Sequence, residues 1–213
     1  MFIRYIDDYK DLVEELKYDI HLIAMVIEFI ELKLDDYVNY KKSIDDANNI
    51  NDNKTLIEMS YNERVSLFKY TMLNTQLCGG YISEMVLVHI YIVIEEYLNK
   101  ICSLLVIEKE IKCDIKKIKC SIERYRFILD SKNIINANKK YFKDLDALRK
   151  IRNAIVHNRK KIKNKDVESV SKYVYIDDMN YVSTNIDTVK RFFVLFEKYI
   201  STIFQEMNLL IKE

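Results

Sequence analysis

The 213-residue chain contains only two glycines and no proline. These two residue types provide most of the tight turns, bulges and strand ends that a sheet-rich fold requires. About half of the residues are apolar and 31% are charged, which is the profile of a folded globular protein rather than a disordered one. The sequence therefore predicts an all-α fold in which long helices are joined by polar, Asn/Asp-rich loops.

The N-terminal part of the chain predicts a helical hairpin. Apolar residues recur at steps of three and four from Val13 to Val38, which is typical of one long amphipathic helix of roughly 35 residues. The polar segment 45–53 indicates a loop, and residues 54–73 favour a second helix. We therefore expect residues 1–75 to form a hairpin of long helices that extends the rest of the fold.

Residues 76–213 predict an up-and-down four-helix bundle. The predicted helices cover residues 83–107, 108–129, 140–157 and 188–211. The first of these is apolar nearly all round, so it should be central. The last carries an aromatic stripe that should face the core rather than stack on bases. Segments rich in Tyr and Val on both sides of Asp177-Asp178-Met179-Asn180 predict one short β-hairpin near 173–183.

Cysteine and hydropathy patterns argue against a metal centre and a membrane span. No Cys-x-x-Cys pair is present, and Cys113 and Cys120 are spaced as packing residues on one helix face. The most apolar run, 85–94, is too short to cross a bilayer, and acidic residues interrupt the N-terminus where a signal peptide would be apolar. We expect a cytoplasmic protein with reduced thiols, no metal and no cofactor. His21 and His89 lie in apolar stretches and are expected to be core residues.

The two halves of the chain differ strongly in charge, although the formal net charge of the whole is only +1. Residues 1–105 contain 10 Lys or Arg against 18 Asp or Glu, a net charge of −8. Residues 106–213 contain 24 against 15, a net charge of +9. This asymmetry is compatible with a surface in the second half that binds a polyanion.

One short segment of the basic half combines a residue type that binds anions with one that transfers protons. Arg152, Asn153 and His157 lie within six residues near the end of a predicted helix, and Asn153 and His157 share a helix face because they are four apart. Arginine is a fixed cation, and histidine exchanges protons near neutral pH. The alternative interpretation is structural, since a basic side chain at a helix C-terminus also complements the helix dipole.

The string Arg152-Asn153-x-x-x-His157, followed by Asn158, resembles the R-x4-6-H motif of HEPN domains, in the variant with a polar residue directly after the arginine. Many HEPN domains are metal-independent endoribonucleases, and others are inactive binding modules. The resemblance implies a HEPN-like bundle over residues 76–213. It also implies a homodimer in which two motif helices face each other across one RNA cleft.

The resemblance further implies roles for individual residues. Arg152 would grip phosphate, His157 would transfer protons, and Asn153 would orient the histidine or bind phosphate. An acidic residue often lies near the motif arginine in related domains, which favours Glu95 as a partner of Arg152 or His157. Equally, one of the pair Glu95 and Glu96 could be exposed and the other bonded locally.

Basic residues around the motif could contact flanking phosphates, namely Arg149, Arg159, Lys160 and Lys161. The leading hypothesis is a ribonuclease that serves as a toxin or antiviral defence effector, and such an effector could have an antitoxin or regulatory protein as partner. A second hypothesis is an inactive HEPN module that binds RNA, a nucleotide or a protein. A third is a helical interaction protein in which the motif is a coincidence.

Overall fold

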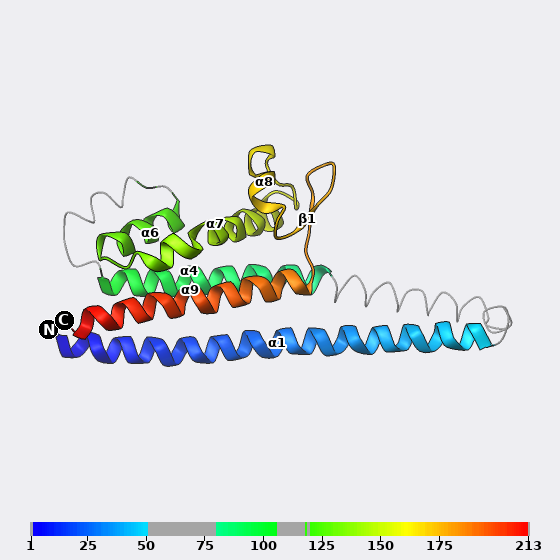
Figure 1. Cartoon of the computed structure of the whole chain (residues 1–213), viewed down its shortest axis with the longest axis horizontal. Coiled ribbons are helices and arrows are strands. Elements are labelled where there is room, and N and C mark those ends of the chain that lie inside the picture. The colour runs from blue at the N-terminus through cyan, green and yellow to red at the C-terminus, as the bar shows by residue number, and fades with distance from the viewer. Residues whose placement is uncertain (1, 51–79, 106–117, 119, 213) are drawn as a thin grey trace.

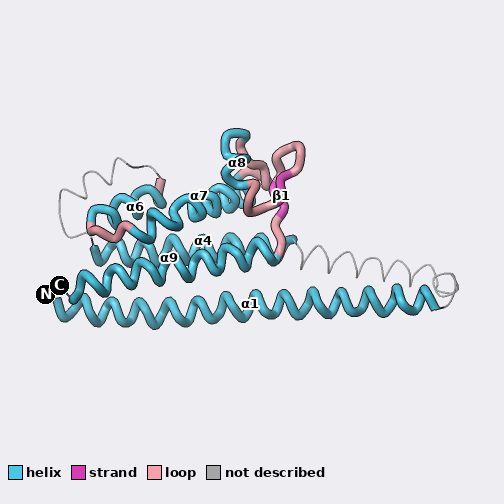
Figure 2. The backbone as a smooth tube through the Cα atoms, in the orientation of Figure 1, coloured by secondary structure: helices cyan, strands magenta, loops and turns pink. Residues whose placement is uncertain are grey.

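The computed structural model describes residues 2–50, 80–105, 118 and 120–212, and it is dominated by helices (Figures 1 and 2). The expected all-α bundle is confirmed. The described helices are α1 (Phe2–Ile50), α4 (Ile82–Leu105), α6 (Ser121–Ser131), α7 (Asn136–His157), a 3-10 turn (Asn164–Asp166), α8 (Val167–Val170) and α9 (Ile186–Lys212).

The long helices form layers (Figure 1). Helix α1 packs on α4 and α9, and on their other side α4 and α9 pack against α7, which also contacts α6 and α8. The directions of α1, α4, α7 and α9 alternate along the bundle (Figure 1). The apolar side chains that α1 buries, from Leu12 to Ile30, belong to the same core as those of the other helices. The predicted boundary between residues 75 and 76 lies outside the described residues.

The central layer supplies most of the core. Tyr97 of α4 and Phe192, Phe196 and Tyr199 of α9 are among the largest fully buried side chains, so the aromatic stripe of the last helix faces the core as predicted. The tyrosine hydroxyls do not remain unpaired inside this core. Tyr97 donates a hydrogen bond to Asp19 of α1 (2.8 Å), and Tyr199 donates one to the buried amide of Asn138 on α7 (2.9 Å). These bonds fix the register of α1 on α4 and of α7 on α9.

Two predictions about local structure are wrong. Residues 45–50 are helical rather than a loop, because α1 continues to Ile50. An already formed helix extends through Asp and Asn at a cost of only a few tenths of a kcal/mol per residue. His21 and His89 are exposed rather than buried, since each lies on the side of its helix that faces away from the core. Residues 51–53 and the helix expected over 54–73 lie outside the described residues, as does most of 108–120.

The predicted short hairpin is present, and it is attached to the end of α7. Strands β1 (Tyr175–Ile176) and β2 (Val182–Ser183) pair antiparallel, with Tyr175 opposite Ser183. The chain that leaves α7 pairs with the other edge of this hairpin. Ile162 donates its backbone N–H to the Asn180 carbonyl (2.9 Å), and Val182 donates to the Lys160 carbonyl (2.9 Å). The hairpin therefore holds the basic loop of residues 159–165, which follows the Arg/His motif.

The described cysteines are packing residues, and the described helices do not include a membrane-spanning one. Cys102 is buried, which raises the pKa of its thiol to about 12, and Cys120 is half-buried, in keeping with packing roles. Cys78 and Cys113 lie outside the described residues. No described helix has the length and apolar character needed to cross a membrane.

Candidate functional site

The C-terminal half of α7 presents Asn153 and His157 of the motif to one cleft, whereas Arg152 is not among the residues that line it. Arg149, Asn153 and His157 follow one another at steps of four and line the same hollow of about 510 Å³. The opposite wall is the loop after α7. The full lining is Arg149, Lys150, Asn153, Ala154, His157, Asn158, Lys161, Ile162, Lys163, Lys165 and Asp166. Five of these residues are Lys or Arg and one is acidic, so the cleft favours an anionic ligand.

Arg152 and His157 are in direct contact. The Arg152 Nη1 atom lies 2.9 Å from His157 Nε2 and donates a second hydrogen bond to Asn153 Oδ1 at 3.0 Å. A guanidinium has only donors, so Nε2 is the acceptor in this contact. The three motif residues thus form one hydrogen-bonded unit in which Arg152 donates to both Asn153 and His157.

The guanidinium of Arg152 keeps its positive charge available. It lies over the ring of Tyr91 on α4, with 5.6 Å between the guanidinium carbon and the ring centroid. Its Nε is buried and has no hydrogen-bond partner in the described structure, and none of the described carboxylates forms an ion pair with it. Burial raises the pKa of the Tyr91 phenol, and the negative charge of Glu95 raises it further, so Tyr91 stays neutral beneath the arginine.

Glu95 is placed differently from the expectation based on the resemblance. It accepts a hydrogen bond from Ser121 Oγ of α6 at 2.5 Å, and no bond from it to Arg152 or His157 is found among the described residues. Its neighbour Glu96 is exposed and pairs with Lys100 (3.1 Å) one turn along α4. The arrangement corresponds to the alternative in which one glutamate is exposed and the other is bonded nearby. A role for Glu95 at the site would have to act through Tyr91.

The turn after α7 is strained, and an ion pair between half-exposed Lys160 and buried Glu84 holds it. Arg159 and Lys160 both adopt left-handed backbone conformations (φ 48° and 68°), which cost about 1–2 kcal/mol each for residues other than glycine. The Lys160 N–H closes the helix end by donating to the Ala154 carbonyl at 2.7 Å. Its Nζ reaches back to Glu84 Oε1 of α4 at 2.7 Å. The Glu84 side chain is only 7% exposed. This contact places the basic loop beside His157.

The predicted phosphate-binding residues divide into two groups. Arg149 pairs with Asp146 (2.6 Å), and Lys160 is bound to Glu84, so both cations are engaged within the protein. Lys150 is similarly shared between Asp146 (3.0 Å) and Asp166 (3.1 Å). Arg159 and Lys161 are exposed, and Lys161 lies 5.7 Å over the ring of Tyr181. Arg159 and Lys161, with Lys163 and Lys165, are therefore better placed to meet a ligand than Arg149 or Lys160.

Sequence reasoning did not single out Glu84, Tyr91, Lys163 or Lys165. The two residues on α4 are 76 and 61 positions from their partners Lys160 and Arg152, so no local pattern could indicate them. Lys163 and Lys165 belong to the basic run of residues 159–165, which follows the motif. The high density of lysine in that run was the only sequence signal for them.

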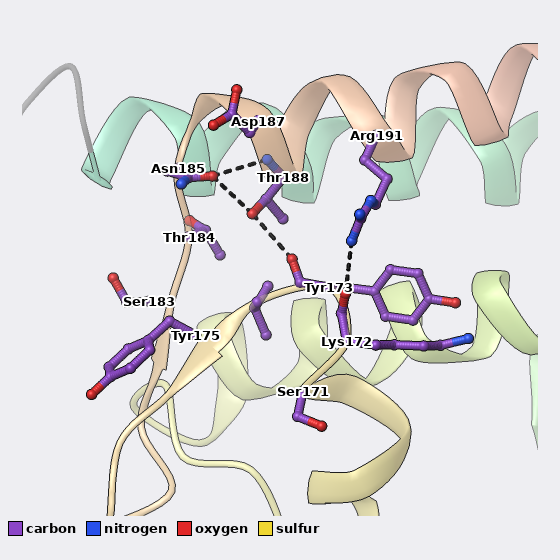
Figure 3. Close-up of a pocket in the computed structure, with 11 residues that line it drawn as sticks. Ser171, Lys172, Tyr173, Tyr175, Ser183, Thr184, Asn185, Asp187, Thr188 and Arg191 are labelled. Carbon is purple, nitrogen blue, oxygen red and sulfur yellow. Dashed lines mark hydrogen bonds between the residues drawn. The ribbon is translucent and has the colours of Figure 1, made fainter.

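A second hollow, of about 450 Å³, lies between the hairpin and the start of α9 (Figure 3). Its polar groups are largely bonded to one another. Asn185 accepts hydrogen bonds from the N–H and the hydroxyl of Thr188 (both 3.0 Å), and Arg191 donates to the Lys172 carbonyl at 2.7 Å (Figure 3). Hydrogen bonds around this hollow thus join the segment before the hairpin to α9. They help to fix the hairpin that holds the basic loop.

Within the described residues, no group of three or more His, Cys, Asp or Glu side chains is arranged to hold a metal ion. Comparison of the chain with protein-family models, with curated proteins and with solved structures found no match.

Proposed function

We propose that the protein is a metal-independent endoribonuclease of the HEPN type that works as a homodimer. The observation that carries this proposal is the 2.9 Å contact between Arg152 and His157 at a cleft whose lining includes five Lys or Arg residues. The motif resemblance in residues 152–158 and the helical bundle around it support the same function. The proposed role as a toxin or antiviral effector rests on the resemblance alone. The same holds for an antitoxin or regulatory partner and for a cytoplasmic location.

RNA cleavage by this route uses the nucleophile that the substrate already carries. A base removes the proton of the 2′-hydroxyl, the 2′-oxygen attacks the adjacent phosphorus, and the bond from phosphorus to the 5′-oxygen breaks. An acid then protonates the departing 5′-oxygen, which leaves a 2′,3′-cyclic phosphate and a 5′-hydroxyl. His157 Nε2 would act as the base once the phosphate draws Arg152 away from it, because its one lone pair accepts the Arg152 hydrogen bond in the structure. Arg152 would stabilise the crowded, doubly charged phosphorane through its planar donors.

A single chain does not complete this set of groups. Of the three histidines, His157 alone lines the cleft, so the acid has to come from elsewhere. A second copy related by a two-fold axis would bring a second histidine to the same phosphate, and two-fold packing is the commonest oligomeric arrangement. Val156, one turn beyond Arg152, is 47% exposed and would lie at such a contact.

The test is cleavage of a structured RNA by the purified full-length chain in excess EDTA, followed by analysis of the new ends. We expect cyclic-phosphate and 5′-hydroxyl ends, and their loss in both Arg152→Ala and His157→Ala. Arg126→Ala and His21→Ala are matched controls, because these side chains are exposed on other helices and should leave cleavage unchanged. Full activity in either motif variant would refute the proposal.

RNA binding without cleavage is the second candidate function, and the cationic lining of the cleft favours it directly. Binding of intact RNA that weakens with rising salt and with Lys163→Ala or Lys165→Ala, in the absence of any cleavage, would select it. Toxicity on expression that is relieved by His157→Ala would instead support the effector role.

A further inference from the structure

The outer face of α1 carries a continuous apolar stripe. Its members recur at steps of four and three residues, which is the spacing of a coiled-coil seam, and each is between 41% and 64% exposed. We call this set the α1 stripe: Tyr18, Leu22, Met25, Phe29 and Leu32. Val26, beside it, is a further 43% exposed. Single exposed apolar residues are common on proteins, but an ordered row of five large ones marks an interaction surface.

The α1 stripe is separate from the face that α1 uses in its own fold. The buried face includes Leu16, Ile23 and Ile27, whereas Met25 lies two positions from both Ile23 and Ile27. At 3.6 residues per turn, two positions correspond to about 200° around the helix. The stripe therefore points directly away from α4 and α9. A helix that is apolar on two opposite sides needs partners on both.

We infer that the α1 stripe is the contact for a second copy of this chain, with the two α1 helices parallel and related by a two-fold axis. The area agrees with this. A fully exposed large side chain presents about 200 Å², so the five exposed fractions amount to roughly 550 Å² per chain and 1,100 Å² for two. That is near the lower limit for a specific dimer, and Val26 with the flanking stems adds to it. Both helices are already formed, so little ordering cost opposes the pairing.

Charges beside the α1 stripe select the parallel arrangement. With Leu22 and Phe29 at the a positions, Glu28 falls at a g position and Lys33 at the e position of the next heptad. In a parallel pair, each Glu28 then faces the Lys33 of the other copy, and both residues are exposed. Towards the N-terminus the seam ends at Glu15, the next a position, which is bound to Lys100 of α4 (2.6 Å). The contact is therefore a short one of about four turns.

This dimer differs from the one in the proposed function. Helices α1 and α7 lie on opposite sides of the α4 and α9 layer (Figure 1). Pairing through α1 thus leaves the Arg/His cleft of each copy open to solvent. If the motif faces also pair, each chain has two different contacts, and dimers joined by both would assemble into tetramers or longer arrays.

The first test measures the mass of the full-length chain by light scattering or sedimentation equilibrium at increasing concentration. We expect a species of twice the 25.6 kDa of one chain, with a dissociation constant raised at least about tenfold by Met25→Lys. Met179→Lys is the matched control, since Met179 is 70% exposed on the hairpin and should not alter the mass. Unchanged helical content of both variants by circular dichroism excludes loss of folding.

The second test concerns direction. Glu28→Lys should weaken the dimer through repulsion from Lys33, and adding Lys33→Glu should restore it. A Met25→Cys variant should form a disulfide-linked dimer under mild oxidation that the unmodified chain does not form, because a parallel in-register pair places the two positions opposite each other. A monomer at all concentrations would overturn the inference. A dimer that is insensitive to Met25→Lys but broken by Val156→Lys would also overturn it, and would place the contact on the motif face.

Discussion

The ion pair between Glu84 and Lys160 should control the loop that follows the motif. The perturbation is a double-mutant cycle with Glu84→Gln, Lys160→Met and the two combined. Each substitution keeps the approximate size of the side chain and removes its charge, and Lys160→Met leaves a non-glycine residue at the left-handed position. The cycle therefore isolates the charge interaction from the backbone strain.

The expected magnitude follows from the geometry. Unit charges 2.7 Å apart attract by about 6 kcal/mol at an effective dielectric constant of 20. Most of that is offset by desolvation, because the Glu84 side chain is 7% exposed, and by screening at Lys160, which is 45% exposed. The pair lies between exposed pairs, worth about 0–1 kcal/mol, and fully buried pairs, whose disruption costs about 3–5 kcal/mol. We expect a coupling of about 1–2 kcal/mol.

Two measurements check this value. Chemical denaturation of the four proteins gives the coupling, and each single variant should melt several degrees lower, since 1 kcal/mol corresponds to about 2–4 °C in a chain of this size. Hydrogen exchange should show faster exchange at the amides of Lys160, Ile162 and Val182, whose bonds close the loop. A coupling below about 0.3 kcal/mol, with unchanged protection of these amides, would refute the proposed clamp.

Three further predictions concern stability. Arg159→Gly should stabilise the fold by about 0.5–1 kcal/mol in a melting experiment, because glycine adopts the left-handed conformation at Arg159 (φ 48°) without steric cost. Burial acts to raise the pKa of Asp146, but hydrogen bonds from Arg149 and Lys150 outweigh it and hold the pKa below its ordinary value. The stabilisation from Asp146 should therefore be present above about pH 4 and be lost as the pH falls further, and Asp146→Asn should flatten that decline in denaturation curves. Tyr199→Phe should cost about 1–3 kcal/mol by leaving the buried Asn138 amide oxygen without its donor, whereas Tyr175→Phe, at a 71% exposed residue, should change little.

The sequence predicted the elements whose signals are local. The apolar period placed the start of α4 to within one residue, at Ile82 against the predicted Ser83. The turn chemistry of Asp177 to Asn180 predicted the hairpin, where Asp177 accepts hydrogen bonds from the N–H groups of Met179 and Tyr181. Local signals misled at 45–50, where polar composition suggested a loop although helix propagation is inexpensive. They also misled at His89, where apolar neighbours hid the fact that the residue is on the outer face.

The sequence predicted which residues of α7 form the site, but not which residues of other helices contact them. Arg152, Asn153 and His157 are close in sequence, so their grouping on one helix end followed from spacing. The tyrosine beneath Arg152 and the glutamate that anchors Lys160 come from another helix. The left-handed conformations of Arg159 and Lys160 could not be predicted, because these positions hold neither Gly nor Asn, the residues that usually adopt them. Such contacts depend on how α4 and α7 cross, which no single stretch of sequence specifies.

The length of α1 has a practical consequence for any study of this protein in solution. Forty-nine helical residues span about 73 Å, whereas a roughly spherical domain of 213 residues measures about 44 Å across. Friction on a rod-like body exceeds that on a sphere of equal mass. Even one copy should therefore elute from a sizing column ahead of globular standards of its mass. Small-angle scattering should give a pair-distance distribution with a long tail, produced by the projecting end of α1 beyond the bundle (Figure 1).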